Sequence, residues 1–184
     1  MRTTIGIAID IPEPWRGQLT RRRADAGDLA AEHIPAHLTL LGPTEVDNGD
    51  LRQVAAHLST VAAGHEPFRL HLRGTGTFRP LTEVVFVAVV AGIGDCERLA
   101  AALRELPAID PPQRYSYHPH VTVAQDVPPE ALDAVLTDLA DFEAKFMVTG
   151  FTLFEHGRDG RWRPLREFRL GDGVAPPPAS HRRR

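Results

Sequence analysis

Pro35-Ala-His-Leu-Thr-Leu-Leu41 and His118-Pro-His-Val-Thr-Val-Ala124 are two stretches that carry the same His-x-Thr pattern on an apolar background. Their aliphatic and β-branched residues favour a strand in both cases. On a strand, residues i and i+2 point to the same face, so each stretch presents a histidine beside a threonine. The residues between and after them pack on the opposite face: Leu38, Leu40, Val121 and Val123.

The elements around the two motifs repeat in one order. Residues 3–11 and 84–90 are expected as buried strands, and each precedes a helix, a His-x-Thr strand and a second helix. Ile9 precedes His37 by nearly as many residues as Val89 precedes His120. Such a repeat indicates an internal duplication, in which two similar lobes face each other across a cleft.

Several boundaries follow from local signals. We expect residues 15–30 to be helix-permissive and residues 34–41 to form a strand that ends at Gly42-Pro43. Apolar stripes over residues 51–62 and 96–103 predict two amphipathic helices, the second capped by Asp95. Residues 144–155 and 162–170 are predicted as two closing strands. Residues 1–171 are expected to form one bilobal domain, and residues 172–184 a disordered tail rich in Pro and Arg.

Composition limits the classes of function. The net charge of -3 argues against non-specific wrapping of nucleic acid, although a local basic pocket still allows a small anionic ligand. The single cysteine, Cys96, excludes an internal disulfide and a cysteine-rich zinc module. No stretch approaches the length of a membrane span, and the N-terminus does not have the pattern of a signal peptide, so a cytoplasmic protein is expected.

Two imidazoles and two hydroxyls in one cleft suit the hydrolysis of a phosphodiester. One histidine activates water as a base and the other protonates the leaving oxygen, while Thr39 and Thr122 donate hydrogen bonds to phosphate oxygens. This scheme needs neither a metal nor another cofactor. His118 and His120 also have a spacing that can bind metal, but no third ligand is evident in the sequence nearby.

The paired motifs resemble those of the 2H phosphoesterase superfamily, which includes bacterial RNA 2',3'-cyclic phosphodiesterases known as 2'-5' RNA ligases. Gly76-Thr-Phe78 and Phe151-Thr-Leu-Phe-Glu155 are similar to its central and C-terminal segments. The resemblance covers roughly residues 1–171. It implies an α+β fold with two antiparallel sheets around a central cleft and helices outside. It also implies that His37 donates a proton and His120 accepts one, with the assignment open to reversal by substrate direction.

Substrate contacts are expected just before the second motif and on the central segment. The candidates are Arg114, Tyr115, Tyr117, Phe78 and Arg79, through phosphate pairing or base stacking. The expected partners are RNA ends or small cyclic-phosphate nucleotides, and nothing in the sequence requires more than a monomer. Two alternatives stay open: a module that binds nucleotides or RNA ends without turnover, and a purely structural domain.

Overall fold

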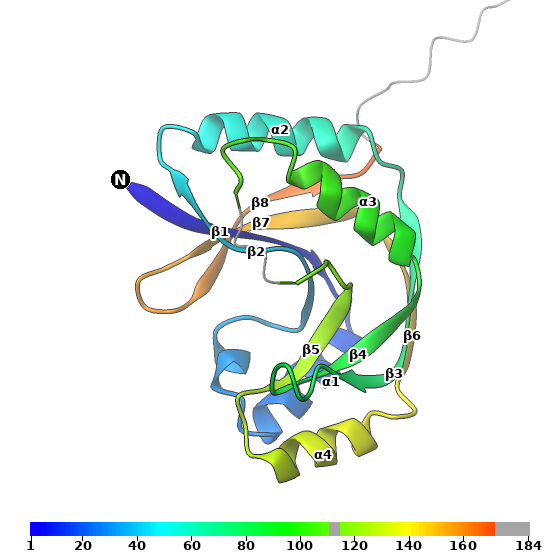
Figure 1. Cartoon of the computed structure of the whole chain (residues 1–184). Helices are drawn as coiled ribbons and strands as arrows, with labels where there is room; N and C mark the ends of the chain where they lie inside the picture. The colour runs from blue at the N-terminus through cyan, green and yellow to red at the C-terminus, as the bar shows by residue number, and fades with distance from the viewer. Residues whose placement is uncertain (111–114, 172–184) are drawn as a thin grey trace, which may run out of the picture.

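Eight strands form a single antiparallel sheet in the computed structural model, which describes residues 1–110 and 115–171 (Figure 1). The order across the sheet is β6-β3-β4-β5-β2-β1-β7-β8. The bounds of the strands are β1 Arg2–Asp10, β2 His37–Asp47, β3 Phe68–Thr77, β4 Val84–Ala91, β5 His120–Gln125, β6 Glu143–Val148, β7 Gly150–His156 and β8 Trp162–Arg169.

The middle of the sheet is a seam between β2 and β5. Here the two strands are paired at one position, where Leu38 lies opposite Val121. From this seam outward, β2 and β1 lie on one side and β5 and β4 on the other, so each His-x-Thr strand has the same place in its half. The α+β class predicted from the sequence is confirmed, but the expected two sheets are joined into one curled sheet.

The helices pack across the seam. α1 (Trp15–Asp25) follows β1 yet contacts β5, and α3 (Ile93–Leu103) follows β4 yet contacts β2. α2 (Leu51–Ala63) lies on α3 and β8, whereas α4 (Pro129–Asp138) lies on β3, β4 and β5. Each half is therefore covered by a helix that the other half supplies, which ties the two halves together.

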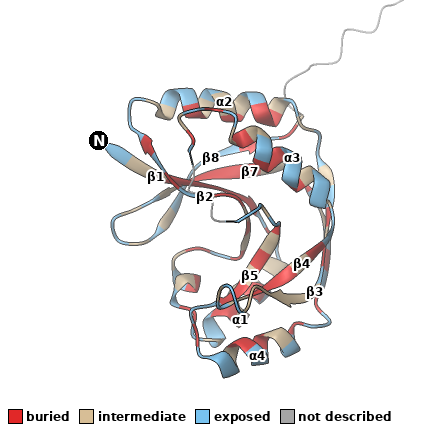
Figure 2. Ribbon diagram, in the orientation of Figure 1, coloured by how far each residue is buried: buried red, intermediate tan, exposed pale blue. Residues whose placement is uncertain are grey.

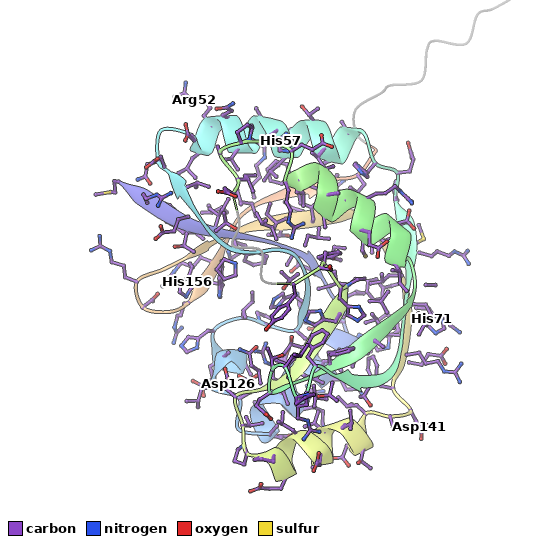
Figure 3. All side chains as sticks on the ribbon, viewed as in Figure 1. Arg52, His57, His71, Asp126, Asp141 and His156 are labelled. Atoms are coloured by element: carbon purple, nitrogen blue, oxygen red, sulfur yellow. The ribbon has the colours of Figure 1, made fainter. Side chains whose placement is uncertain are left out.

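Amphipathic faces fix how the helices sit. α2 buries Val54 and Leu58 and α3 buries Leu99, while their other faces are exposed (Figure 2). Charged side chains such as Arg52 on α2 point outward (Figure 3). No helix in the described part of the chain combines the length and the apolar character that a membrane span needs.

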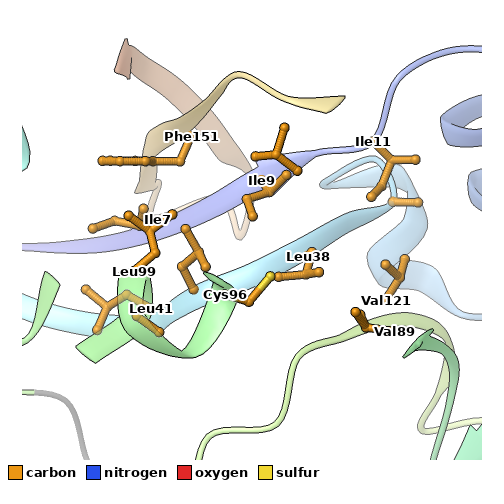
Figure 4. Close-up of a cluster of buried hydrophobic side chains, with 14 of the residues drawn as sticks. Ile7, Ile9, Ile11, Leu38, Leu41, Val89, Cys96, Leu99, Val121 and Phe151 are labelled. Atoms are coloured by element: carbon orange, nitrogen blue, oxygen red, sulfur yellow. The ribbon is translucent and has the colours of Figure 1, made fainter. Parts of the chain in front are cut away.

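The apolar sides of the motif strands form the centre of the core. Leu38, Leu40, Val121 and Val123 are all fully buried. Figure 4 shows Leu38 and Val121 in the apolar cluster that also holds Ile9 of β1 and Cys96 of α3. The predicted alternation of β2 and β5 is therefore present, with the histidines and threonines half-buried between fully buried neighbours.

Two strand boundaries differ from the prediction. The β2 strand continues through Gly42-Pro43, because both residues lie in a bulge: Ile5 pairs with Thr44 and Ile7 with Leu41, so two residues oppose Gly6. A bulge tolerates proline, since the extra residue needs no ladder hydrogen bond.

Residues 144–155 are two strands rather than one. β6 pairs with β3 at one edge of the sheet, and β7 pairs with β1 in the other half, with Thr149 between them. A continuous apolar run does not indicate which strand each of its parts pairs with, so this crossover could not be predicted from the sequence.

Two local assignments also change. The helix after residue 14 ends at Asp25, and a 3-10 turn, η1 (Leu29–Glu32), follows after Gly27 with its left-handed φ of 88°. Gly92, not Asp95, is the N-terminal capping residue of α3, and Asp95 lies in its first turn. The predicted tail, residues 172–184, lies outside the described residues.

Candidate active site

The seam sets the positions of the four motif side chains. Leu38 lies opposite Val121 in an antiparallel pair, and continuing that register by one residue in each direction would set His37 opposite Thr122 and Thr39 opposite His120. Directly opposite residues have Cβ atoms about 4.5–5.5 Å apart, and diagonal ones roughly 7–8 Å. The two histidines are on the diagonal of this square, a separation that one phosphate group can bridge. The sequence predicted a shared face, and the register supplies the juxtaposition.

Both imidazoles are held in the same way. Nδ1 of His37 donates to the carbonyl oxygen of Pro35 at 2.9 Å, and Nδ1 of His120 donates to that of His118 at 2.7 Å. A carbonyl can only accept, so Nδ1 carries the proton in the neutral ring. Nε2 of each ring is therefore the atom free to accept a proton or, once protonated, to donate it.

Burial lowers the pKa of both histidines below the usual 6.5. For His37, burial is the main cause, and the charge of Arg23 lowers the pKa further, while the bond to Pro35 and the charge of Asp10 raise it. For His120, burial is again first, and the charges of His118 and His37 add to it, against the bond to the His118 carbonyl. A positive charge on His37 thus disfavours a second positive charge on His120.

A cavity of about 330 Å³ opens over the motif strands. Its walls include His37, Thr39 and Thr122, together with Arg23 of α1 and residues of β1, β2, β5, β7 and β8: Gly6, Ile7, Ala8, Leu41, Gly42, Pro43, Gln125, Phe154 and Trp162, with Ala30 and Ile34. The volume is at the small end of the range for ligand pockets. The cavity is thus lined by three of the four motif side chains, and His120 is not among its lining residues.

His120 has an aromatic surrounding instead. Its ring lies edge-on to Phe78, with 4.9 Å between the centroids, and 5.4 Å from Phe86. The ring of His118 contacts the same two phenylalanines and stacks beside His120, with 6.2 Å between the histidine centroids. Gly76 makes room for this group, because a Cβ there would come within 2.6 Å of the Phe86 ring.

The candidates for substrate contact are placed differently. Phe78 packs against the His120 ring, and the Tyr117 hydroxyl donates to the carbonyl oxygen of Thr39 at 3.1 Å, so both support the motif residues. Arg79 is held by Asp133 of α4 at 2.7 Å, and Tyr115 is 61% exposed. Arg114 lies outside the described residues. None of the four described candidates lines the cavity, so their contact with substrate stays a prediction.

Arg23 is a site residue that the sequence analysis missed. It stands in Arg21-Arg-Arg23, a run typical of solvated charge, yet it is 4% exposed and lines the cavity. Its Nε donates to the buried carboxylate of Asp28 at 2.6 Å, and that carboxylate also accepts from the Ala30 backbone. Helical periodicity cannot reveal this, because the partner that makes burial of the charge possible is Asp28, the residue that caps η1, and not a residue of α1.

Trp162 is a second missed residue. It lines the cavity from β8, and its ring crosses Gly6, where a Cβ would lie 2.8 Å from Trp162 Cζ3. The His118–His120 spacing does not belong to a larger cluster: over residues 1–110 and 115–171, no three His, Cys, Asp or Glu side chains are grouped so as to hold a metal ion. The metal-independent chemistry stays a prediction.

Comparison with known proteins shows the family and the fold of this chain. Residues 11–160 match the family described as the 2'-5' RNA ligase superfamily. A putative phosphoesterase of Bacillus thuringiensis is 28% identical over 144 residues, which are 76% of this chain and 81% of that protein. The crystal structure of E. coli LigT in apo form has a TM-score of 0.68 and 26% identity, covering 92% of this chain and 98% of that one.

The crystal structure of the Thermus thermophilus protein TT0787 is similar as well, with a TM-score of 0.66, 27% identity and coverage of 93% and 98%. The matched residues include both motifs of the seam. Motifs, fold and comparisons lead to the same conclusion. This chain belongs to the 2'-5' RNA ligase superfamily, within the 2H phosphoesterases.

Proposed function

We propose that this protein is a phosphodiesterase that hydrolyses 2',3'-cyclic phosphate or 2'-5'-linked phosphodiesters of RNA or nucleotides, with His37 and His120 as acid and base. The observation that supports the proposal is the pairing of Leu38 with Val121, by which the two His-x-Thr strands β2 and β5 are neighbours in the sheet. E. coli LigT has been crystallised with 3'-AMP and with phosphate, which supports a nucleotide phosphate as the ligand of this fold.

In this mechanism, Nε2 of His120 removes a proton from water as the water oxygen attacks phosphorus. The bond from phosphorus to one ribose oxygen breaks, and Nε2 of protonated His37 delivers a proton to that oxygen, which leaves a phosphate monoester. The assignment of His37 as the acid rests on the family resemblance of the first motif, because the charge of Arg23 lowers the pKa of His37 by more than the charge of Asp10 raises it.

Thr39 and Thr122 hold the phosphate between the rings. Neither hydroxyl donates to a protein acceptor among the described residues, although both side chains are half-buried on the cavity wall. Each hydroxyl is therefore free to donate to a non-bridging oxygen, where negative charge increases in the transition state. Each positioned proton transfer contributes on the order of a hundred- to ten-thousandfold in rate.

The test is hydrolysis of adenosine 2',3'-cyclic phosphate and of a 2'-5'-linked diadenosine, each with and without EDTA. We expect turnover that survives EDTA and falls at least about a hundredfold in His37→Ala and in His120→Ala. His71→Ala is the matched control, because His71 lies on β3 away from the seam and pairs with Glu143 (Figure 3). Binding without turnover would favour the non-catalytic module, and loss of activity in EDTA would favour a metal enzyme.

A further inference from the structure

The guanidinium group of Arg23 is the starting point for a second subsite. Its side chain is 5% exposed and its Nε is bound to Asp28. The two Nη atoms donate no hydrogen bond to any described residue. No fully buried side-chain nitrogen in the described part of the chain lacks a partner, so both Nη atoms retain some access to solvent. Because Arg23 lines the cavity, the Nη atoms have the cavity as their open side. A buried guanidinium with unused donors is a built site for an anion.

The charges around the cavity favour the same ligand. Arg23 is the one formally charged side chain among the described residues that line the cavity. Asp28 lies behind it, on the Nε side, and is itself occupied by Arg23 and the Ala30 backbone. The carboxylate of Asp10, whose charge raises the pKa of His37, does not line the cavity and accepts a hydrogen bond from Thr152 at 2.6 Å. An anion in the cavity can therefore bind the Arg23 guanidinium group, which carries one positive charge and has free Nη donors.

The position of Arg23 separates this anion from the phosphate that reacts. The charge of Arg23 lowers the pKa of His37, whereas the charges that shift His120 are those of His118 and His37. The cavity likewise joins Arg23 to His37 and does not reach His120. Arg23 therefore shares the cavity with His37, whereas in the proposed mechanism the reacting phosphorus lies between the His37 and His120 rings, so an anion at Arg23 is a different group from the one that reacts.

We propose that Arg23 binds a second phosphate of the substrate, the one on the 5' oxygen of the nucleoside whose cyclic phosphate is opened. This inference rests on the proposed function and narrows its substrate class. A free nucleoside 2',3'-cyclic monophosphate has no such group, whereas an RNA 3' end always has one, in its last internucleotide linkage. Arg23 then selects RNA ends, or 5'-phosphorylated nucleotides, over free cyclic mononucleotides.

The experiment compares three substrates: adenosine 2',3'-cyclic phosphate, the same compound with a 5'-phosphate, and ApA ending in a 2',3'-cyclic phosphate. One contact between a charged donor and phosphate corresponds to about 10- to 100-fold in kcat/KM. We expect the wild-type protein to prefer the two substrates with the extra phosphate by that factor. A preference for the 5'-phosphorylated mononucleotide without one for ApA would restrict the subsite to phosphate monoesters.

Two variants test whether Arg23 is the cause. Arg23→Lys keeps the charge but has one ammonium group for both Asp28 and the ligand, so the preference should decrease. Arg23→Gln combined with Asp28→Asn removes both buried charges together, which avoids an unpaired carboxylate and keeps an acceptor for the Ala30 backbone. In the double variant we expect the ratio of kcat/KM between the substrates with and without the extra phosphate to fall to about one, independently of any change in the hydrolysis of the plain cyclic nucleotide that follows from removing the Arg23 charge near His37.

The outcomes separate the two proposals. Equal kcat/KM for all three substrates in the wild-type protein, or a preference that survives in the double variant, would overturn the Arg23 subsite and leave the phosphodiesterase intact. No hydrolysis of any substrate would overturn the proposed function. Binding of 5'-AMP to His37→Ala, followed by calorimetry, gives a readout without turnover: Arg23→Gln/Asp28→Asn in that background should weaken it about 10-fold or more.

Discussion

Replacing the two motif threonines by valine tests the seam geometry most directly. Thr39 and Thr122 donate no hydrogen bond to the protein within the described residues, so valine removes a hydroxyl that folding does not use. A hydrogen bond to a charged group is worth about 1.5–3 kcal/mol. Thr39→Val and Thr122→Val should therefore each lower kcat/KM by about 10- to 150-fold, with each unfolding free energy unchanged within about 0.5 kcal/mol.

The assay is hydrolysis of adenosine 2',3'-cyclic phosphate beside urea unfolding of the same samples. Thr75→Val is the matched control, because the Thr75 hydroxyl on β3 donates to the carbonyl oxygen of Leu136 at 2.7 Å. Losing that bond should cost about 1 kcal/mol of stability and leave kcat/KM unchanged. The control is thus expected to lose stability and keep its kcat/KM, whereas the motif variants are expected to keep their stability and lose kcat/KM.

The double variant Thr39→Val/Thr122→Val completes a mutant cycle. If both hydroxyls hold one phosphate, their effects should not be independent, and the cycle should show a coupling of at least about 0.5 kcal/mol. Motif variants that lose stability but keep kcat/KM would refute the reasoning, because the hydroxyls would then serve the fold. Additive effects would refute the claim that both reach the same phosphate.

Three further predictions follow from the site. Because burial lowers the pKa of both His37 and His120 below 6.5 and turnover needs one ring protonated and one neutral, the kcat/KM profile should be bell-shaped with its maximum below pH 6.5; a maximum above pH 7 would contradict this. As pH falls, the unfolded chain takes up protons on these two histidines before the folded protein does, so the free energy of unfolding should decrease from pH 6.5 downward through their folded pKa values. Urea unfolding at pH 7.5 and 5.5 should show a smaller decrease between the two pH values in His37→Gln/His120→Gln than in the wild-type protein. Gly76→Ala places a Cβ 2.6 Å from the Phe86 ring, so it should lower the free energy of unfolding by about 1–3 kcal/mol and reduce kcat by displacing the phenylalanine rings that contact His120. Gly49→Ala, which has open space around it, is the control and should change neither thermal unfolding nor kcat.

Local pattern was sufficient for most elements. Alternation at period two identified the motif strands and their buried faces, and the apolar stripes of residues 51–62 and 96–103 predicted α2 and α3. The wrongly predicted strand boundaries are those that depend on which strands pair in the sheet. Gly42-Pro43 continues the strand because β2 forms a bulge there opposite Gly6 of β1, and residues 144–155 divide because their two parts pair with β3 and β1.

The sequence by itself determined that His37 and Thr39 share a face, and that His120 and Thr122 share another, because neighbours two apart on a strand are fixed by backbone geometry. Tertiary structure alone decided that these faces are the same one. That depends on Leu38 meeting Val121 across the seam, a register set by core packing between segments far apart in the chain. Tertiary structure also decided where Arg23 lies. Its burial depends on the ion pair with Asp28, and the proposed binding of an anion depends on the cavity that Arg23 lines together with residues of β1, β2 and β8.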